Sequence, residues 1–256
     1  MTLSPFEQFK SYIEKSSEVL ILIPENPSGD AVGTAWGLYF FLEKNNIKPA
    51  IAFSNSLSSK YSFLPKPERI LSEISGARKF VLSFDTERNK IIDLKTEIAE
   101  NRYTIYLTPE KGALDPRDFS FILAKFQYDL IVVIDCADLE KLGKIYDSNP
   151  DLFFEVPVAN IDHRSENENF GQINLVDITA SSCSEILYNA LEQIDPQAID
   201  KIVADCLLTG IISATDSFQK KNTTPKALAR AAELMEKGAD QQLIIRWLYK
   251  TQPFLK

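Results

Sequence analysis

The stretch VLILIPENPSGDAVG, residues 19–33, passes from a run of apolar residues through a turn into a segment with helical periodicity. We expect a buried strand over residues 18–23, because a short, continuous apolar run suits a parallel strand covered on both faces. We expect a helix from Asp30 to about Lys44, since its apolar side chains recur at helical spacing. A turn between a strand and a helix is where an α/β protein usually keeps its functional residues.

The same pattern recurs along the chain. Apolar runs predict further strands at residues 50–53, 80–84, 130–134 and 155–161, and helical spacing predicts helices at residues 67–74 and 182–193. Ser4 and Glu7 form the expected capping box of a first helix that ends near Lys15. The last part of the chain, from about residue 196 to 256, contains repeated helix starts and stops, at Asp195-Pro196, Thr224-Pro225, Gly238 and Asp240.

These elements predict an α/β fold, Rossmann-like and doubly wound, with a mainly parallel sheet, helices on both faces and a helical C-terminal end. One segment, residues 86–125, breaks the alternation. Residues 90–95 and 103–107 resemble two strands joined at Glu100-Asn101-Arg102, which predicts an inserted β-hairpin. We favour a hairpin that only adds to the edge of the sheet. The alternative is a loop that binds a substrate or a partner, because insertions of this length often carry function. We expect residues 1–256 to form a single domain.

Composition restricts the class of protein. The 256 residues carry a net charge of -8, which argues against broad, sequence-independent binding of nucleic acid. The three cysteines are far apart and in apolar surroundings, so we expect buried thiols in a reducing cytosol. The N-terminus lacks the pattern of a signal peptide, and no run approaches the ~20 apolar residues of a membrane span. We therefore expect a soluble, cytoplasmic protein that does not bind membranes.

His163 is the only histidine of the chain and follows an expected strand directly. Asp135 also ends an expected strand, and Asp30 opens the helix after the first strand. The three side chains meet only if their strands are neighbours in the sheet. Two carboxylates with one imidazole suit manganese or magnesium better than zinc. The alternatives are structural: a helix-capping role for Asp30 and a turn role for Asp135.

Four blocks of sequence, in this order, resemble the motifs of the DHH (also written DDH) phosphoesterases. They are ENPSGDAVGTAWGLYFFLEK (25–44), VVIDCADLEKLG (132–143), NIDHRSENENFGQINLVDITASSCSEILYNAL (160–191) and LLTGIISATDSFQKKNTTPKALARAAELMEKGAD (207–240). This family includes RecJ-like exonucleases, oligoribonucleases, cyclic-dinucleotide phosphodiesterases, exopolyphosphatases and one class of inorganic pyrophosphatase. The resemblance implies two divalent metals, manganese or magnesium, bridged by an aspartate and activating a hydroxide for attack on phosphate.

The resemblance assigns Asp30 as a metal ligand, Asp135 as the bridging aspartate and His163 as the histidine ligand, so that Asp135 and His163 are the expected catalytic residues. Four positions depart from the family pattern. Pro24, Ser28, Arg164 and Ala214 stand where a histidine, an aspartate, a histidine and an aspartate are expected. None of the four is a usual metal ligand. The first metal then retains only Asp135, while the second retains Asp30, Asp135 and His163.

An anion site is expected to remain where the first metal is lost. The guanidinium of Arg164 repels a cation and suits a phosphate. Ser28 and Gly29 begin the helix of Asp30, and backbone N–H groups at a helix start bind anions. The family's second domain has a glycine-rich, histidine-containing signature, which this sequence lacks, so we expect that domain to be absent from the chain.

Three functions follow from the sequence. The favoured one is a catalytically degenerate DHH protein that binds a nucleotide, a short oligonucleotide or another phosphate-containing ligand, or a protein partner. The second is a metal-dependent phosphodiesterase or phosphatase with a reduced metal site. The third is an interaction protein that uses the hairpin at 86–125 to bind a partner. A homodimer is a further expected assembly.

Overall fold

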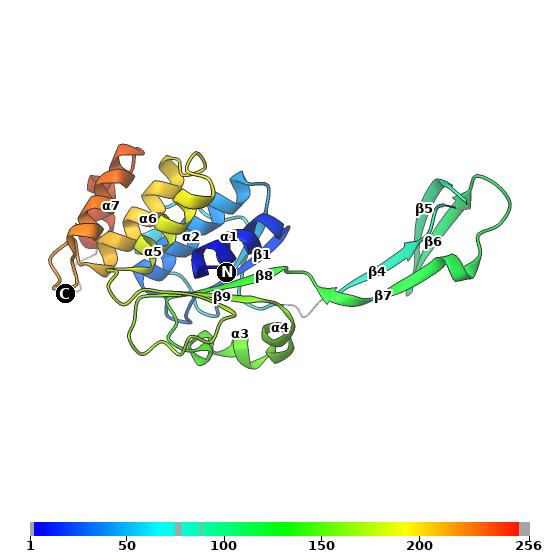
Figure 1. The fold of residues 1–256 in the computed structure, drawn as a ribbon, viewed down its shortest axis with the longest axis horizontal. Coiled ribbons are helices and arrows are strands. Elements are labelled where there is room, and N and C mark those ends of the chain that lie inside the picture. Colours follow the sequence, from blue (N-terminus) through cyan, green and yellow to red (C-terminus); the bar gives the residue numbers. More distant parts are fainter. Residues whose placement is uncertain (1–2, 75–77, 88, 251–256) are drawn as a thin grey trace. The chain divides into compact units, whose positions relative to one another are not determined.

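The computed structural model describes residues 3–74, 78–87 and 89–250. The chain divides into two compact units (Figure 1). The first contains Met1–Gly76 and Tyr128–Lys256, and the second contains Ala77–Gln127. Within the described residues no helix has the length and apolarity that crossing a bilayer requires.

The first unit is built on a six-stranded sheet in the order β10-β9-β8-β1-β2-β3. Every pairing in this sheet is parallel. Its strands β1, β8 and β9 are buried throughout, as expected for apolar strands covered on both faces. The six strands are β1 (Glu18–Leu22), β2 (Lys48–Ala52), β3 (Ile70–Leu71), β8 (Leu130–Ile134), β9 (Val158–Asp162) and β10 (Ile173–Val176).

Helices cover both sides of this sheet. Figure 1 shows α2, α5 and α6 on one side and the short α3 and α4 on the other. The helices are α1 (Pro5–Lys15), α2 (Gly29–Lys44), α3 (Lys144–Asp147), α4 (Pro150–Glu155), α5 (Cys183–Ile194), α6 (Lys201–Ala214), α7 (Pro225–Glu236) and α8 (Gln241–Ile245). Single turns also occur at η1 (Ser59–Tyr61), η2 (Pro116–Asp118), η3 (Leu139–Leu142) and η4 (Arg246–Lys250). The α/β fold, its parallel sheet and its helical C-terminal end are therefore confirmed.

Close packing of α2 against α6 holds the start of α2 in place. A Cβ atom added to Gly33 would lie 2.5 Å from the backbone N of Gly210 and 2.5 Å from the carbonyl O of Cys206. Glycine therefore lets the two helix backbones approach each other at this point. On the adjacent turn, a Cβ atom on Gly210 would lie 2.9 Å from Asp30 Oδ1. The α2–α6 contact thus fixes the position of Asp30.

Several expected elements differ in the structure. The prediction of a helix at 67–74 is wrong, because that segment contains the two-residue strand β3. The strand expected at 155–161 is shorter in the structure. Glu155 is the last residue of α4, and β9 starts only at Val158. The helix expected to start at Asp195-Pro196 starts at Lys201, because Asp200 caps it by accepting from the N–H groups of Ile202 and Val203.

The second unit consists of two separate two-stranded antiparallel sheets. One pairs β4 (Arg78–Phe84) with β7 (Phe119–Phe126), so the strand expected at 80–84 does not belong to the parallel sheet. The other pairs β5 (Ile91–Ala99) with β6 (Arg102–Pro109), which contain the two expected hairpin strands. Glu100 adopts a left-handed backbone, with φ of 46°, in the turn between them. The hairpin therefore forms its own sheet and does not extend the parallel one.

Candidate functional site

Three neighbouring strands deliver the predicted site residues. Asp30 lies in the first turn of α2, after β1; Asp135 follows β8; and His163 follows β9. Because β9, β8 and β1 are adjacent in the sheet, their carboxyl ends meet at one edge. The order of strands in the sheet also reverses here, because β2 lies on one side of β1 and β8 lies on the other. Ligands of open α/β sheets bind at such a switch point.

A pocket of about 300 Å³ opens at this edge. Of the residues expected from the sequence, Ser28, Asp30, Asp135, His163 and Arg164 line it. Gly29 lies beside it, in the first turn of α2, where an added Cβ atom would be 2.1 Å from Ser213 Oγ. Ala214, which stands where the family pattern has a ligand aspartate, also lines the pocket. Sequence reasoning missed three further lining residues from the end of α6 and the loop that follows, Ser213, Lys220 and Asn222.

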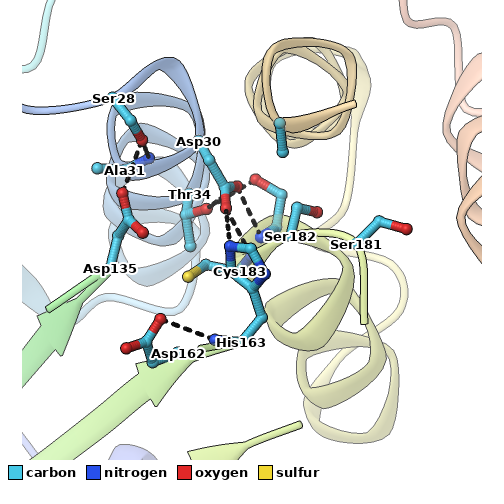
Figure 2. A network of polar contacts seen from close by, with 12 residues as sticks. Ser28, Asp30, Ala31, Thr34, Asp135, Asp162, His163, Ser181, Ser182 and Cys183 are labelled. Carbon is cyan, nitrogen blue, oxygen red and sulfur yellow. Dashed lines mark hydrogen bonds and ion pairs between the residues drawn. The ribbon is translucent and has the colours of Figure 1, made fainter. Parts of the chain in front are cut away.

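Asp30 is buried and is held by the start of another helix (Figure 2). Its Oδ2 accepts from the backbone N–H of Cys183 at 2.7 Å, and its Oδ1 accepts from the N–H of Ser184 at 3.1 Å and from Thr34 Oγ1 at 3.2 Å. Burial, followed by the nearby charge of Asp135, raises its pKa to about 6. Asp30 therefore compensates the positive end of α5. The sequence analysis considered such a capping role for Asp30 at its own helix, which is α2.

His163 faces the same carboxylate. Its Nε2 lies 3.7 Å from Asp30 Oδ2. The backbone N–H of His163 donates to Asp162 Oδ1 at 2.8 Å, and Asn167 donates to Asp162 Oδ2 at 2.8 Å. Asn167 also donates to the carbonyl of Cys136, at 2.9 Å. Asp162 and Asn167 thus fix the turn that presents His163, a positioning role that the sequence analysis did not identify.

Asp135 has a protein donor on each carboxylate oxygen. Ser28 Oγ donates to its Oδ2 at 2.7 Å. The guanidinium of Arg164 donates to its Oδ1 and also to its carbonyl oxygen, the latter at 2.9 Å. Burial raises the pKa of Asp135, and the charge of Arg164 and the hydrogen bond from Ser28 oppose this shift. Two of the residues that replace expected ligands therefore bind the carboxylate that would bridge the two metals.

One group of side chains could hold a single metal ion. Asp30, Asp135, His163 and Cys183 each offer one ligand atom, and these atoms lie within 4.8 Å of one another. Cys183 was expected only as a buried thiol, and no spacing in the sequence indicated its closeness to Asp30, 153 residues away. Burial raises the pKa of its thiol well above the usual value. The residues fit one ion, and they do not fit the two-ion arrangement of the resemblance, because Ser28 and Arg164 engage the bridging carboxylate.

Comparisons with known proteins identify the family. The model of the DHH family, N-terminal domain, matches residues 18–211. The bifunctional oligoribonuclease and PAP phosphatase NrnA of Bacillus subtilis is 29% identical over 172 residues, which cover 61% of this chain and 51% of that protein. The cyclic-di-AMP phosphodiesterase GdpP of Bacillus subtilis is 26% identical over 254 residues, which cover 94% of this chain and 31% of that protein.

The solved structures agree on the fold. An exopolyphosphatase-related protein from Bacteroides fragilis superimposes with a TM-score of 0.71 at 20% identity, covering 98% of this chain and 61% of that one. The chain spans 51% and 31% of the lengths of NrnA and GdpP from Bacillus subtilis. Because the family model matches well over half of the chain, the protein belongs to the DHH family, through that family's N-terminal domain.

Proposed function

We propose that this protein is a catalytically degenerate DHH-family phosphoesterase that binds a nucleotide, a short oligonucleotide or another phosphate-containing ligand without hydrolysing it efficiently. The observation that carries this proposal is the pair of bonds to Asp135, from Ser28 and from Arg164. A guanidinium stays protonated at all physiological pH values. It therefore gives Asp135 a permanent cationic partner at the position where the family pattern implies a histidine beside two ions.

The pocket provides groups that suit a phosphate. Lys220 and Arg164 both line it and are cationic. The Ser28 side chain and carbonyl accept from the N–H groups of Ala31 and Val32, which leaves Gly29 and Asp30 to present the first amides of α2. The two pocket carboxylates are already compensated, Asp135 by Arg164 and Asp30 by the amides of α5. An incoming anion therefore meets less repulsion than two bare carboxylates would cause.

The proposed class of ligand follows from the names of related proteins. NrnA is named as an oligoribonuclease and PAP phosphatase, and GdpP as a cyclic-di-AMP phosphodiesterase, so both act on phosphate esters of nucleotides. The proposed ligand of this protein is drawn from the same chemistry. At about 300 Å³ its pocket is at the lower end of the size range of ligand sites, and charged side chains line it, so it does not suit a large apolar ligand.

The experiment pairs binding with hydrolysis. Calorimetric titration with adenosine 3′,5′-bisphosphate and with a short RNA should show binding, and incubation of both with manganese or magnesium should show no metal-dependent product. Lys220→Ala should weaken binding at least tenfold, because Lys220 lines the pocket. Lys221→Ala is the matched control, since its neighbouring side chain is also exposed and does not belong to the described lining. Metal-dependent turnover that His163→Ala abolishes would overturn the proposal.

A second function, an active phosphodiesterase or phosphatase with one ion, is supported by the four ligand atoms within 4.8 Å of one another. Asp30, Asp135 and His163 would hold the ion, which would supply polarisation of a bound phosphate. The same hydrolysis assay separates the two functions. A third function, protein interaction through the inserted hairpin, is supported by the exposed apolar side chains of β5 and β6.

A further inference from the structure

The β5–β6 hairpin has one apolar and one polar face. Its register pairs Leu94 with Leu107, Thr96 with Ile105, and Ile98 with Tyr103, so these six side chains share one face. The intervening pairs place Asp93 and Thr108, Lys95 and Tyr106, Glu97 and Thr104, and Ala99 and Arg102 on the other face. Apart from Thr96, the first face is wholly apolar, and we call it the hairpin apolar face.

The hairpin apolar face is exposed. The exposed fractions are 57% for Leu94, 74% for Ile98, 60% for Tyr103 and 46% for Ile105. Ile92, at the irregularity in register next to this face, is 65% exposed. Scattered exposed apolar residues are common, but a contiguous group of this kind marks an interaction surface.

A two-stranded sheet also needs a second layer. Isolated hairpins are marginally stable in water, because one pair of strands buries too little apolar surface. Within the part of the chain that the structure describes, β5 and β6 pair only with each other. Its described polar face has a cross-strand contact of its own, from Tyr106 Oη to Glu97 Oε2 at 3.1 Å, and is suited to water. The apolar face is therefore the side that requires a cover.

We propose that a second copy of this chain covers the hairpin apolar face, so that two hairpins pack face to face in a homodimer. This inference is independent of the pocket and of its proposed ligand. A symmetric dimer uses the same patch on both partners, and an apolar face is complementary to itself. Two such hairpins would form a two-layer β arrangement, which is a usual way for sheets to bury an apolar face.

The area is sufficient for a small dimer interface. Burying one large apolar side chain removes roughly 100 Å² from water, so Ile92, Leu94, Ile98, Tyr103 and Ile105 would bury about 500 Å² on each copy. The total of about 1,000 Å² reaches the lower bound for a specific interface. The expected affinity is therefore modest, and the dimer should depend on concentration.

Charge favours the second copy as the occupant. Ala77–Gln127 contains nine Lys and Arg residues and eight Asp and Glu residues, whereas the whole chain has a net charge of -8. The excess of negative charge therefore lies in the other unit. Two copies that meet through the nearly neutral hairpin unit avoid bringing two acidic surfaces into contact. A strongly basic or acidic partner would find no complementary excess of charge on this unit.

Sedimentation velocity of the full chain across a range of concentrations tests the proposal. The wild type should shift from monomer to dimer as concentration rises. Ile98→Lys should raise the dissociation constant at least tenfold, because it places a charge within the apolar interface. Ala99→Lys is the matched control: it adds the same charge at the next exposed position of β5, on the opposite face, and should leave the dimer unchanged.

Crosslinking provides a test that does not depend on a disruptive variant. The three natural cysteines are buried, so an introduced thiol reacts selectively. Thr96→Cys, in the centre of the apolar face, should give a covalent dimer with a short bismaleimide, and Thr104→Cys, on the polar face, should not. A wild type that stays monomeric at all concentrations, or a dimer that Ile98→Lys leaves intact and Thr96→Cys does not crosslink, would overturn the proposal.

Discussion

The guanidinium of Arg164 donates to the side chain of Asp135 and also, at 2.9 Å, to its backbone carbonyl oxygen. The Asp135 side chain is almost completely buried, whereas that of Arg164 is 29% exposed. Asp135 also has a left-handed backbone, with φ of 59°, immediately after β8. One side chain thus compensates a buried charge and holds the bend that presents it.

Removal of that side chain should destabilise the protein. Arg164→Ala leaves the buried carboxylate of Asp135 with the Ser28 hydroxyl as its one side-chain donor among the described residues. We expect a loss of about 1–3 kcal/mol in the free energy of unfolding, below the value for a fully buried ion pair because Arg164 is partly exposed. Urea denaturation at neutral pH measures the loss.

The control for Arg164→Ala is an exposed ion pair in the same unit. Lys141 Nζ lies 3.8 Å from Asp138 Oδ2, and the two side chains are 58% and 25% exposed. Lys141→Ala should cost less than about 1 kcal/mol, because water and salt screen such pairs. Equal losses for the two variants would show that the Asp135–Arg164 pair has no special role in stability.

The buried carboxylate of Asp30 should make stability depend on pH. Its pKa in the folded protein is raised to about 6, whereas an unfolded aspartate titrates near 3.9. Between these two values the folded state binds more protons than the unfolded state, so the contribution of Asp30 to stability falls as pH rises. Above pH 6 that contribution is lost; we expect a change on the order of 1–3 kcal/mol.

Urea denaturation from pH 4 to pH 7 in EDTA measures this dependence, with chelation keeping divalent ions away from the site. Other carboxyl groups contribute opposite slopes, for example Asp177, whose pKa the hydrogen bonds from Thr179 lower. The difference between the wild type and Asp30→Asn therefore isolates the effect. Two parallel curves would contradict the raised pKa of Asp30.

The sequence predicted the parts of the fold that local pattern determines. The strand at 18–23 was predictable from its continuous apolar run, and the helix after it from apolar side chains at helical spacing. The strand β3 has only two residues, too few for a periodicity. The expected helix start at Asp195 was wrong, because the cap that forms is Asp200, which the sequence pattern did not single out.

The candidate site was likewise predictable only in part. Asp30, Asp135 and His163 were predictable because parallel strands bring their carboxyl ends to one edge. The bond between Arg164 and Asp135 depends on side-chain rotamers, and the closeness of Cys183 to Asp30 depends on how α5 packs against α2. Neither relation has a signal in residue spacing, since 29 residues separate the first pair and 153 separate the second.

The presence of Cys183 in the ligand group should change its metal preference. A thiolate and an imidazole suit zinc, whereas carboxylates alone suit manganese and magnesium. We expect zinc to raise the melting temperature more than manganese at equal concentration, through binding to the folded state. Because burial raises the pKa of the Cys183 thiol, the zinc effect should increase with pH. Differential scanning fluorimetry at several pH values tests this.

Cys183→Ser provides the contrast for zinc, since a hydroxyl of similar size replaces the thiol and binds zinc poorly. The advantage of zinc over manganese should disappear in this variant, and the effect of manganese should stay within a factor of two. A zinc effect that survives in Cys183→Ser would assign the ion to Asp30, Asp135 and His163 alone.

Restoring the family's ligands should restore the two-ion site. The variant Pro24→His, Ser28→Asp, Arg164→His and Ala214→Asp removes the two donors that occupy Asp135 and adds four potential ligands. We expect manganese binding by calorimetry and at least a tenfold increase in manganese-dependent hydrolysis of short RNA. The same variant with Asp135→Ala is the control and should lose both properties. If the restored protein binds manganese but gains no hydrolysis, the four substituted positions explain weaker binding of metal ions but not a lack of activity, and hydrolysis then requires groups from outside this domain.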